Sequence, residues 1–219
     1  MPEAVEPVLD IHNLEFGYDQ ESLINIEKFT LSPGEKVAVI GPSGCGKTTL
    51  MHLLAGLIKP RQGVIKLAGQ DITQLGEQQI DRLRGREVGI VFQNLHLMPA
   101  ISILDNLLLA QKLARVDVDK AHALELLARL GIADKANVLP SALSQGQAQR
   151  AAIARAVVHK PKLVIGDEPT SALDRNNANE AIQLLTELAT SINFALLIVT
   201  HDERVSDAMD KVVRLGETS

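Results

Sequence analysis

Residues 41–48 read Gly-Pro-Ser-Gly-Cys-Gly-Lys-Thr and fit the pattern G-x-x-x-x-G-K-[ST]. Gly44 and Gly46 allow backbone turns that point successive N–H groups into one concavity, where they can bind an anion. A lysine placed as Lys47 can reach the β- and γ-phosphates of a nucleotide, and the hydroxyl of Thr48 can take one Mg²⁺ position. A chance match is rare in a chain of this length, so the pattern predicts a phosphate-binding loop.

A second candidate lies at residues 162–168, Lys-Leu-Val-Ile-Gly-Asp-Glu, an apolar strand that ends in two acids. At the carboxyl end of the strand, Asp167 can hold Mg²⁺ through its water shell, and Glu168 is placed to polarise an attacking water. Two acids in an ordinary surface turn are the alternative. In a chain with a phosphate-binding loop, the pair indicates nucleotide hydrolysis.

The loop alone does not identify the reaction, because kinases, GTPases, recombinases and transport ATPases share it. A GTPase would carry the guanine signature N-K-x-D, and this sequence has none. The segment 133–136, Ala-Asp-Lys-Ala, is not such a signature.

The segment 143–147, Leu-Ser-Gln-Gly-Gln, opens an alanine-rich helix expected over residues 147–159. Ser144 can cap this helix, and Gly146 leaves its first turn open. The positive end of a helix dipole attracts anions. Taken alone, however, the segment fits a simple capped helix better than a ligand site.

These motifs need elements that position them. We expect strands over residues 8–16, 24–31, 37–40, 64–67, 88–92, 163–165, 195–199 and 211–215. We expect helices over residues 48–56, 103–113, 120–130 and 147–159, and helical spacing over 182–192. Alternating strands and helices predict an α/β fold with a mostly parallel sheet covered on both faces, and the ranges 8–16 and 24–31 add an N-terminal antiparallel β region.

The domain expected from this pattern is single and covers residues 1–219. Its core would comprise residues 1–93 and 159–219, with an inserted α-helical lobe at about 94–158. The length of 219 residues and the 46% hydrophobic content allow one such domain.

Composition excludes several classes of protein. The net charge of −5 argues against a nucleic-acid-coating surface. A single cysteine excludes an intrachain disulfide. The first ten residues lack the basic region of a secretory signal, and no apolar run is long enough to span a bilayer. The six histidines, apart from His201, show no metal-ligand spacing.

Taken in order along nearly the whole chain, the motifs resemble those of the nucleotide-binding subunits of ATP-binding-cassette (ABC) transporters. Tyr18 resembles the aromatic residue that stacks on adenine, and residues 41–49 resemble the Walker A loop of a P-loop NTPase core. Gln93 resembles the Q-loop glutamine, and residues 143–147 resemble the family signature. Asp167 and Glu168 resemble the Walker B acid and the catalytic base, residues 171–174 resemble the D-loop, and His201 resembles the switch histidine.

The resemblance implies a set of site residues. ATP would contact Tyr18, Gly41, Pro42, Ser43, Gly44, Cys45, Gly46, Lys47, Thr48, Thr49 and Gln93. Mg²⁺ would be held through Thr48, Gln93 and Asp167. The catalytic residues would be Glu168, His201, Gln93 and Lys47, so the chain is expected to be an ATPase.

The resemblance also implies a head-to-tail homodimer with ATP between the two copies. The Walker A loop of one copy would face Ser144, Gly146 and Gln147 of the other, which gives the capped helix end an anion across the dimer. Hydrolysis would open the dimer and drive an integral membrane permease. The protein would then be cytoplasmic and held at the inner face of the cell membrane through that partner.

Two positions depart from the family pattern. Gln145 stands where the signature usually has glycine, but Ser144 and Gly146 are intact, so we expect function to survive. Gly166 stands where alanine or another small residue is usual, and it is also small.

Within the family, the compact form and the segment 92–99, Phe-Gln-Asn-Leu-His-Leu-Met-Pro, resemble the lipoprotein-releasing, macrolide-exporter and cell-division ATPases. Only residues 202–219 follow His201, so we expect no appended regulatory domain. The D-loop sequence Ser-Ala-Leu-Asp differs from the Gly-Asn-Leu-Asp common in that group. A small-solute importer ATPase and a non-transport cell-division regulator therefore remain alternatives, and the cargo and its direction are not encoded in these motifs.

Two further features have two interpretations each. The apolar segment 95–109 is either core of the helical lobe or, around residues 95–100, part of a groove that receives a short helix of the membrane partner. Cys45 either fills a slot for a small residue, which we favour, or acts as a redox brake on the loop.

Overall fold

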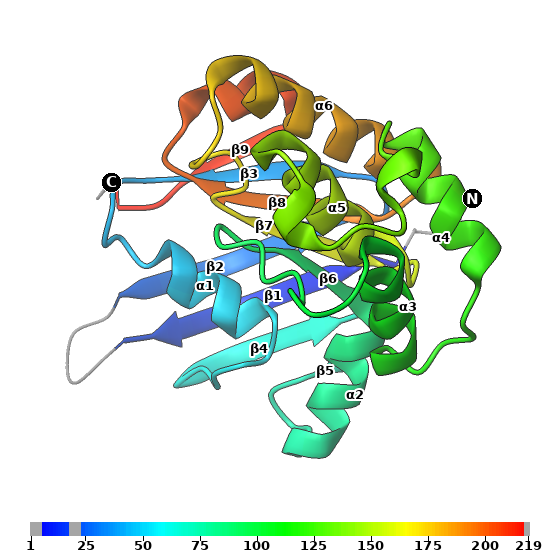
Figure 1. Ribbon diagram of the computed structural model, residues 1–219. Helices are drawn as coiled ribbons and strands as arrows, with labels where there is room; N and C mark the ends of the chain where they lie inside the picture. The colour runs from blue at the N-terminus through cyan, green and yellow to red at the C-terminus, as the bar shows by residue number, and fades with distance from the viewer. Residues whose placement is uncertain (1–5, 18–22, 217–219) are drawn as a thin grey trace, which may run out of the picture.

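The computed structural model describes residues 6–17 and 23–216, and it contains two sheets with helices packed around them (Figure 1). The strands are β1 Leu9–Phe16, β2 Ile24–Leu31, β3 Lys36–Ile40, β4 Gln62–Leu67, β5 Gln70–Asp71, β6 Val88–Val91, β7 Leu163–Asp167, β8 Ala195–Thr200 and β9 Lys211–Arg214. The helices are α1 Lys47–Leu54, α2 Glu77–Glu87, α3 Ile103–Leu113, α4 Lys120–Arg129, α5 Gln145–Val157 and α6 Arg175–Ile192. Short 3₁₀ turns cover Ala133–Lys135, Pro140–Ala142 and Glu203–Ala208.

The first sheet is antiparallel, with strand order β2-β1-β4-β5. Strands β1 and β2 pair antiparallel, with Leu9 opposite Leu31 and Phe16 opposite Ile24. The inward residues of β1, Leu9, Ile11 and Leu14, are fully buried. This sheet confirms the predicted N-terminal antiparallel β region.

The second sheet has the order β6-β7-β8-β3-β9, and all its pairings are parallel. Alternate residues of each central strand face opposite sides. On β8, for example, Leu197 and Val199 join the core shared with α1 and the antiparallel sheet, whereas Leu196 and Ile198 join the core under α3 to α6. Both faces are therefore covered, which explains the continuous apolar runs and confirms the predicted α/β class.

The parallel register brings four strand ends to one edge. Ile40 at the end of β3 pairs with Thr200 of β8, Val199 pairs with Asp167 of β7, and the neighbouring Gly166 pairs with Val91 of β6. The segments that follow these strands carry the phosphate-binding loop, Glu168, His201 and Gln93. Ligands of such folds bind beyond the carboxyl ends of the strands, so this edge is where a site is expected.

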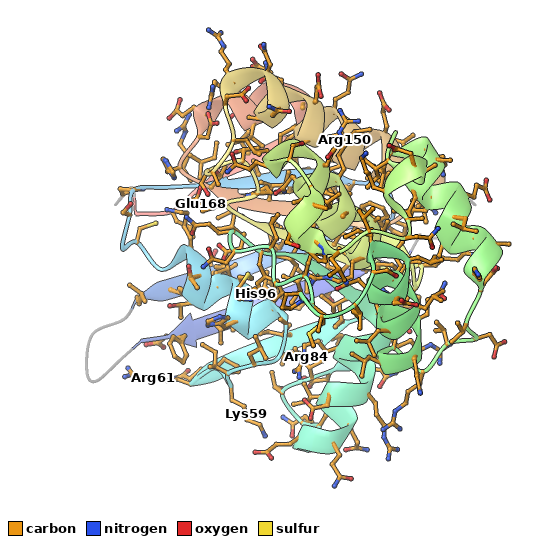
Figure 2. The ribbon with its side chains drawn as sticks, viewed as in Figure 1. Lys59, Arg61, Arg84, His96, Arg150 and Glu168 are labelled. Atoms are coloured by element: carbon orange, nitrogen blue, oxygen red, sulfur yellow. The ribbon has the colours of Figure 1, made fainter. Side chains whose placement is uncertain are left out.

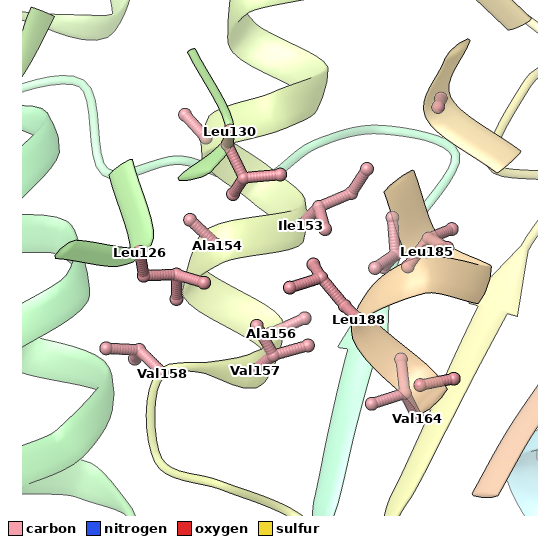
Figure 3. Packing of buried hydrophobic residues seen from close by; sticks show 14 of the residues in the cluster. Leu126, Leu130, Ile153, Ala154, Ala156, Val157, Val158, Val164, Leu185 and Leu188 are labelled. Atoms are coloured by element: carbon pink, nitrogen blue, oxygen red, sulfur yellow. The ribbon is translucent and has the colours of Figure 1, made fainter. Parts of the chain in front are cut away.

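Between β6 and β7 the chain is helical. Helix α5 lies between α4 and α6, as shown by Leu126, Ile153 and Leu188 in Figure 3. The alanines Ala151, Ala152, Ala154 and Ala156 of α5 are at most 4% exposed, so the predicted close packing of this helix is present. The boundaries of a separate lobe at 94–158 stay a prediction.

Within the apolar segment 95–109, most of the large side chains belong to the core. Ile103, Leu104 and Leu107 are buried, and Leu97 packs against the same cluster. Met98 differs, because it is 51% exposed. The buried residues of α3 in this segment therefore belong to the core. The interpretation as a groove for the membrane partner remains for the residues near Met98.

Some elements differ from the expected ones. Helix α2 was not predicted, because only Ile80 and Leu83 of its eleven residues are buried and its apolar periodicity is weak. Helix α5 begins at Gln145 rather than residue 147, and α6 begins at Arg175, directly after its cap Asp174. Among the described residues, no helix combines the length and hydrophobicity that crossing a bilayer requires.

Candidate nucleotide site

The loop after β3 has the geometry of an anion site. Gly44 and Gly46 adopt φ values of +85° and +96°, which few other residues tolerate. Helix α1 follows immediately, and no side chain caps its start. The N–H groups of a first helical turn have no helical acceptors, so here they are available to an anion, with the positive end of the helix dipole behind them.

Lys47 lies inside this loop. Its side chain is only 8% exposed, and Nζ donates to the carbonyl oxygens of Gly41 at 2.8 Å and Pro42 at 2.9 Å. A buried ammonium requires hydrogen-bond acceptors or a counter-charge. The nearest carboxylate oxygen, Oε1 of Glu168, is 3.9 Å away. Lys47 is thus positioned at the cavity by weak partners that phosphate oxygens can replace.

Nine of the predicted residues line one cavity of about 500 Å³. Its lining comprises Leu23, Ser43, Gly44, Gly46, Lys47, Thr48, Thr49, Gln93, Asp167 and Glu168. Three strand ends contribute to this set, as the parallel register requires. Leu23 was missed by the sequence analysis; it stands just before β2, and nothing in its local sequence indicates a ligand contact.

Glu168 is held by polar partners on both of its carboxylate oxygens, and Figure 2 shows it near the carboxyl end of the parallel sheet. Its Oε2 accepts a hydrogen bond from Thr200 Oγ1 at 2.9 Å, and its Oε1 lies 2.9 Å from Nδ1 of His201. Its φ of +47° lies in the left-handed region, which is uncommon for residues other than glycine and tends to occur at functional sites. His201 thus joins the site through Glu168, although it does not line the cavity.

The oxygen atoms in the cavity suit a hard divalent cation. Thr48, Gln93 and Asp167 offer a hydroxyl, an amide and a carboxylate oxygen, the donor types that Mg²⁺ prefers. In the described part of the chain, no group of three His, Cys, Asp or Glu side chains forms a metal cage. Mg²⁺ usually binds through one or two carboxylates together with water and substrate phosphates, so this sparse set fits it.

Burial raises the pKa of Asp167, and the neighbouring charge of Glu168 adds to the rise. The folded state therefore binds a proton at this carboxyl more tightly than the unfolded chain does. The ionised form opposes folding above the folded pKa, and the penalty disappears as the pH falls below the unfolded value.

Asp167→Asn should consequently stabilise the nucleotide-free protein at neutral pH. Thermal unfolding should show a melting temperature raised by about 2 °C, as expected from a change near 1 kcal/mol in a chain of this size. The gain should shrink as the pH is lowered toward about 4, where an unfolded aspartate protonates. Asp117→Asn, at an exposed aspartate outside the site, is the control. A lower melting temperature for Asp167→Asn at neutral pH would contradict the inferred sign.

The signature segment lies apart from this cavity. Ser144 caps α5 as predicted: its Oγ accepts from the N–H of Gln147 at 3.3 Å, and its own N–H donates to Oε1 of Gln147 at 3.0 Å. A methyl group on Gly146 would come within 2.6 Å of Oδ1 of Asn177 on α6, so the Asn177 side chain would have to shift to admit it. Ser144, Gly146 and Gln147 do not line the cavity that contains Lys47.

The remaining predicted residues have different positions. Gly41 and Pro42 contribute the carbonyls that hold Lys47, and Cys45 lies near Leu215 and Gly216 at the end of β9. None of these three lines the cavity. Tyr18, predicted to stack on adenine, lies outside the described residues.

Comparisons with known proteins agree with this geometry. The sequence pattern of the ABC transporter family matches residues 24–171. The chain is 41% identical to the lipoprotein-releasing system ATP-binding protein LolD of Legionella pneumophila (strain Paris), over 92% of this chain and 91% of that protein.

Solved structures share the fold. A dimeric post-hydrolysis structure of the ATP-binding cassette MJ0796, bound to ADP and Pi, superposes with a TM-score of 0.82 at 29% identity and 94% coverage of both chains. The structure of cbiO1 from Clostridium perfringens, part of an ABC transporter complex, gives a TM-score of 0.86 at 28% identity, covering 95% of this chain and 84% of that one.

Proposed function

Because this chain belongs to the ABC transporter family, in which it is an ATP-binding ATPase, we propose that it powers a lipoprotein-releasing membrane complex. The observation that carries the proposal is the similarity to LolD, which extends over more than nine-tenths of both chains. The protein would work as a homodimer, held at the inner face of the cell membrane by a permease subunit.

We assign the triphosphate of ATP to the cavity between α1 and Glu168. The first-turn N–H groups of α1 would bind phosphate oxygens, and Lys47 would exchange the carbonyls of Gly41 and Pro42 for them. Thr48, Gln93 and Asp167 would hold Mg²⁺, which when bound neutralises charge on the β- and γ-phosphate oxygens. The raised pKa of Asp167 agrees with a carboxylate that is best accommodated beside a cation.

Glu168 would accept the proton of the attacking water. Its carboxylate has one oxygen fixed by Thr200 and the other beside His201, so it cannot turn freely. The imidazole of His201 is 60% exposed and can leave Glu168 to contact the γ-phosphate. A general base of this kind contributes roughly 10²- to 10⁴-fold to a rate.

The second half of each site would come from another copy of the chain. The start of α5 carries a reciprocal capping box between Ser144 and Gln147, and its positive dipole end suits an anion. Since this end does not reach the cavity of its own chain, a head-to-tail dimer gives it a phosphate. The structure of MJ0796 bound to ADP and Pi is also dimeric, which supports the dimer.

A groove lined by β6, the segment after it, α3 and the end of α5 is the proposed docking site for the membrane partner. It has a volume of about 310 Å³, and its lining is mostly apolar and includes Val88, Ile90, Phe92, His96, Met98, Leu109, Leu113 and Arg155. Met98 and Leu113 are 51% and 70% exposed. Asn106 fixes the groove wall, because its amide bonds both the N–H and the carbonyl of Met98. The groove therefore joins α3 to the segment that begins at Gln93, which lines the nucleotide cavity.

Met98→Glu should weaken the membrane complex strongly, because it places a charged carboxylate in a mostly apolar contact. We expect the affinity for the partner to fall at least tenfold, about 1.4 kcal/mol or more, and less partner to be recovered when the tagged protein is purified from gently solubilised membranes. Leu124→Glu, at an exposed leucine on α4 outside the groove, is the matched control. Equal recovery with both variants would place docking elsewhere.

The same purification tests the proposed function when the recovered proteins are identified by mass spectrometry. A partner with few membrane spans and a large extracytoplasmic domain, recovered together with lipoprotein, would support it. A permease with many spans and a separate binding protein would indicate a small-solute importer. An active preparation with no membrane partner would indicate a non-transport ATPase.

A further inference from the structure

The side chain of Gln145 bridges two parts of the chain that are far apart in sequence. Gln145 is the first residue of α5, and its Nε2 donates a hydrogen bond to the carbonyl oxygen of Ala172. Ala172 lies in the turn between Glu168 and α6, residues 171–174, which we call the D-turn. A glycine at position 145 could not make this bond.

The D-turn is in turn bonded to the catalytic segment. Both the N–H and the hydroxyl of Ser171 donate to the carbonyl oxygen of Glu168, at 3.1 and 3.0 Å. The N–H of Leu173 donates to the carbonyl of Thr170 at 3.1 Å, which closes the turn. A shift of Ala172 is therefore passed to the backbone that orients the Glu168 side chain.

Packing keeps the two ends of this bridge together. Gly146 lies directly against Asn177 of α6, and Asp174 caps α6 by accepting from the N–H groups of Asn176 and Asn177. Further along α5, Arg150, labelled in Figure 2, pairs with Glu180 of α6 at 2.6 Å. The start of α5 is thus held against the D-turn and α6 by contacts at three positions, Gln145, Gly146 and Arg150.

We propose that Gln145 is a positioning residue that links the two nucleotide sites of the dimer through one chain. The inference rests on the proposed function, because it requires the α5 end to meet the nucleotide held by the other copy. Nucleotide contact at Ser144 would then be transmitted through Gln145 and Ala172 to Glu168 of the same chain, which acts at the opposite site.

Gln145→Met tests the hydrogen bond itself. Methionine has a similar length and helix propensity but cannot donate. We expect kcat for ATP hydrolysis to fall roughly fivefold, the effect of one net hydrogen bond. The KM for ATP should stay within about twofold, because Gln145 does not line the cavity. Gln145→Ala should behave in the same way, and both variants should melt within about 3 °C of the wild-type protein, the change that roughly 1 kcal/mol produces.

A mixing experiment separates transmission within the chain from contact across the dimer. In the first mixture, the Gln145→Met variant, which keeps Glu168, is diluted into an excess of the Glu168→Gln variant. In the mixed dimers that form, only the chain with the altered Gln145 has a Glu168 that can support hydrolysis. In the second, wild-type protein is diluted into an excess of the double variant Gln145→Met, Glu168→Gln. Wild-type protein in an excess of Glu168→Gln is the reference.

The proposal predicts the fivefold loss in the first mixture and the reference rate in the second. A loss in the second mixture alone would mean that Gln145 acts directly on the nucleotide of the other copy, and equal rates in all mixtures would mean that it transmits nothing. Either result would overturn the proposal. Failure of the Glu168→Gln variant to dimerise with ATP would instead refute the dimer, and so the proposed function beneath it.

Discussion

Replacing Glu168 with glutamine should abolish ATP hydrolysis and leave ATP binding intact. Glutamine keeps the length of the side chain and an oxygen that can accept from Thr200 Oγ1, so the local structure should persist. It removes the carboxylate that would take the proton of the attacking water. We expect phosphate release to slow by at least about 100-fold, in the range found for loss of a general base.

The same variant should accumulate as a dimer. If hydrolysis opens the two copies, then Glu168→Gln with ATP and Mg²⁺ should elute from size-exclusion chromatography at twice the mass of the nucleotide-free protein. Glu187→Gln, at an exposed glutamate on α6, should hydrolyse ATP like the wild-type protein and remain in exchange between the two forms. Hydrolysis at the normal rate by Glu168→Gln would show that another group is the base.

The convergence of the catalytic motifs could be predicted because it depends on few physical rules. Residues 37–40, 163–165 and 195–199 are continuous apolar runs, and such runs alternating with helices indicate a buried parallel sheet. Parallel strands end at the same edge, so the segments after Ile40 and Asp167 had to meet. The register of β3, β7 and β8 confirms this arrangement.

Features that depend on contacts between distant segments could not be predicted in the same way. Leu23 enters the cavity only because β2 begins beside the phosphate-binding loop, and Gln145 meets Ala172 only because α5 packs on α6. Helix α2 is missed for a different reason. It buries two side chains and is otherwise polar, so it lacks the periodicity on which the other helices were recognised.

Gly89 must be a glycine for a reason that the sequence pattern does not indicate. It reads as an ordinary member of the strand expected at 88–92, yet the structure leaves it no room for a side chain. A methyl group there would come within 2.0 Å of the carbonyl oxygen of Ala156 and 3.3 Å of Cγ of Pro161. Helix α5 therefore touches β6 backbone to backbone, and glycine is what allows this contact.

Gly89→Ala should accordingly be strongly destabilising. The obstacle is a backbone carbonyl rather than a flexible side chain, so α5 must move away from the sheet. Overpacking of this kind costs about 3 kcal/mol at the upper end of its usual range. For a chain of this size, that loss lowers the melting temperature by roughly 6–12 °C, which calorimetry on the purified protein would measure.

Gly166→Ala is the matched control, because Gly166 lies in the neighbouring strand β7 and is also fully enclosed. A methyl group at this position would approach Cγ of Pro169 at 3.2 Å, a tight contact with a side chain that a small shift relieves. We expect its melting temperature to lie within about 3 °C of the wild-type value, the change that roughly 1 kcal/mol produces. If Gly89→Ala melted as close to the wild-type protein as Gly166→Ala does, the separation of α5 from β6 would have to be larger than the structure gives. If Gly89→Ala melted as predicted, its residual ATPase activity would show how far catalysis tolerates a displaced α5, since Ser144 and Gln145 both move with that helix.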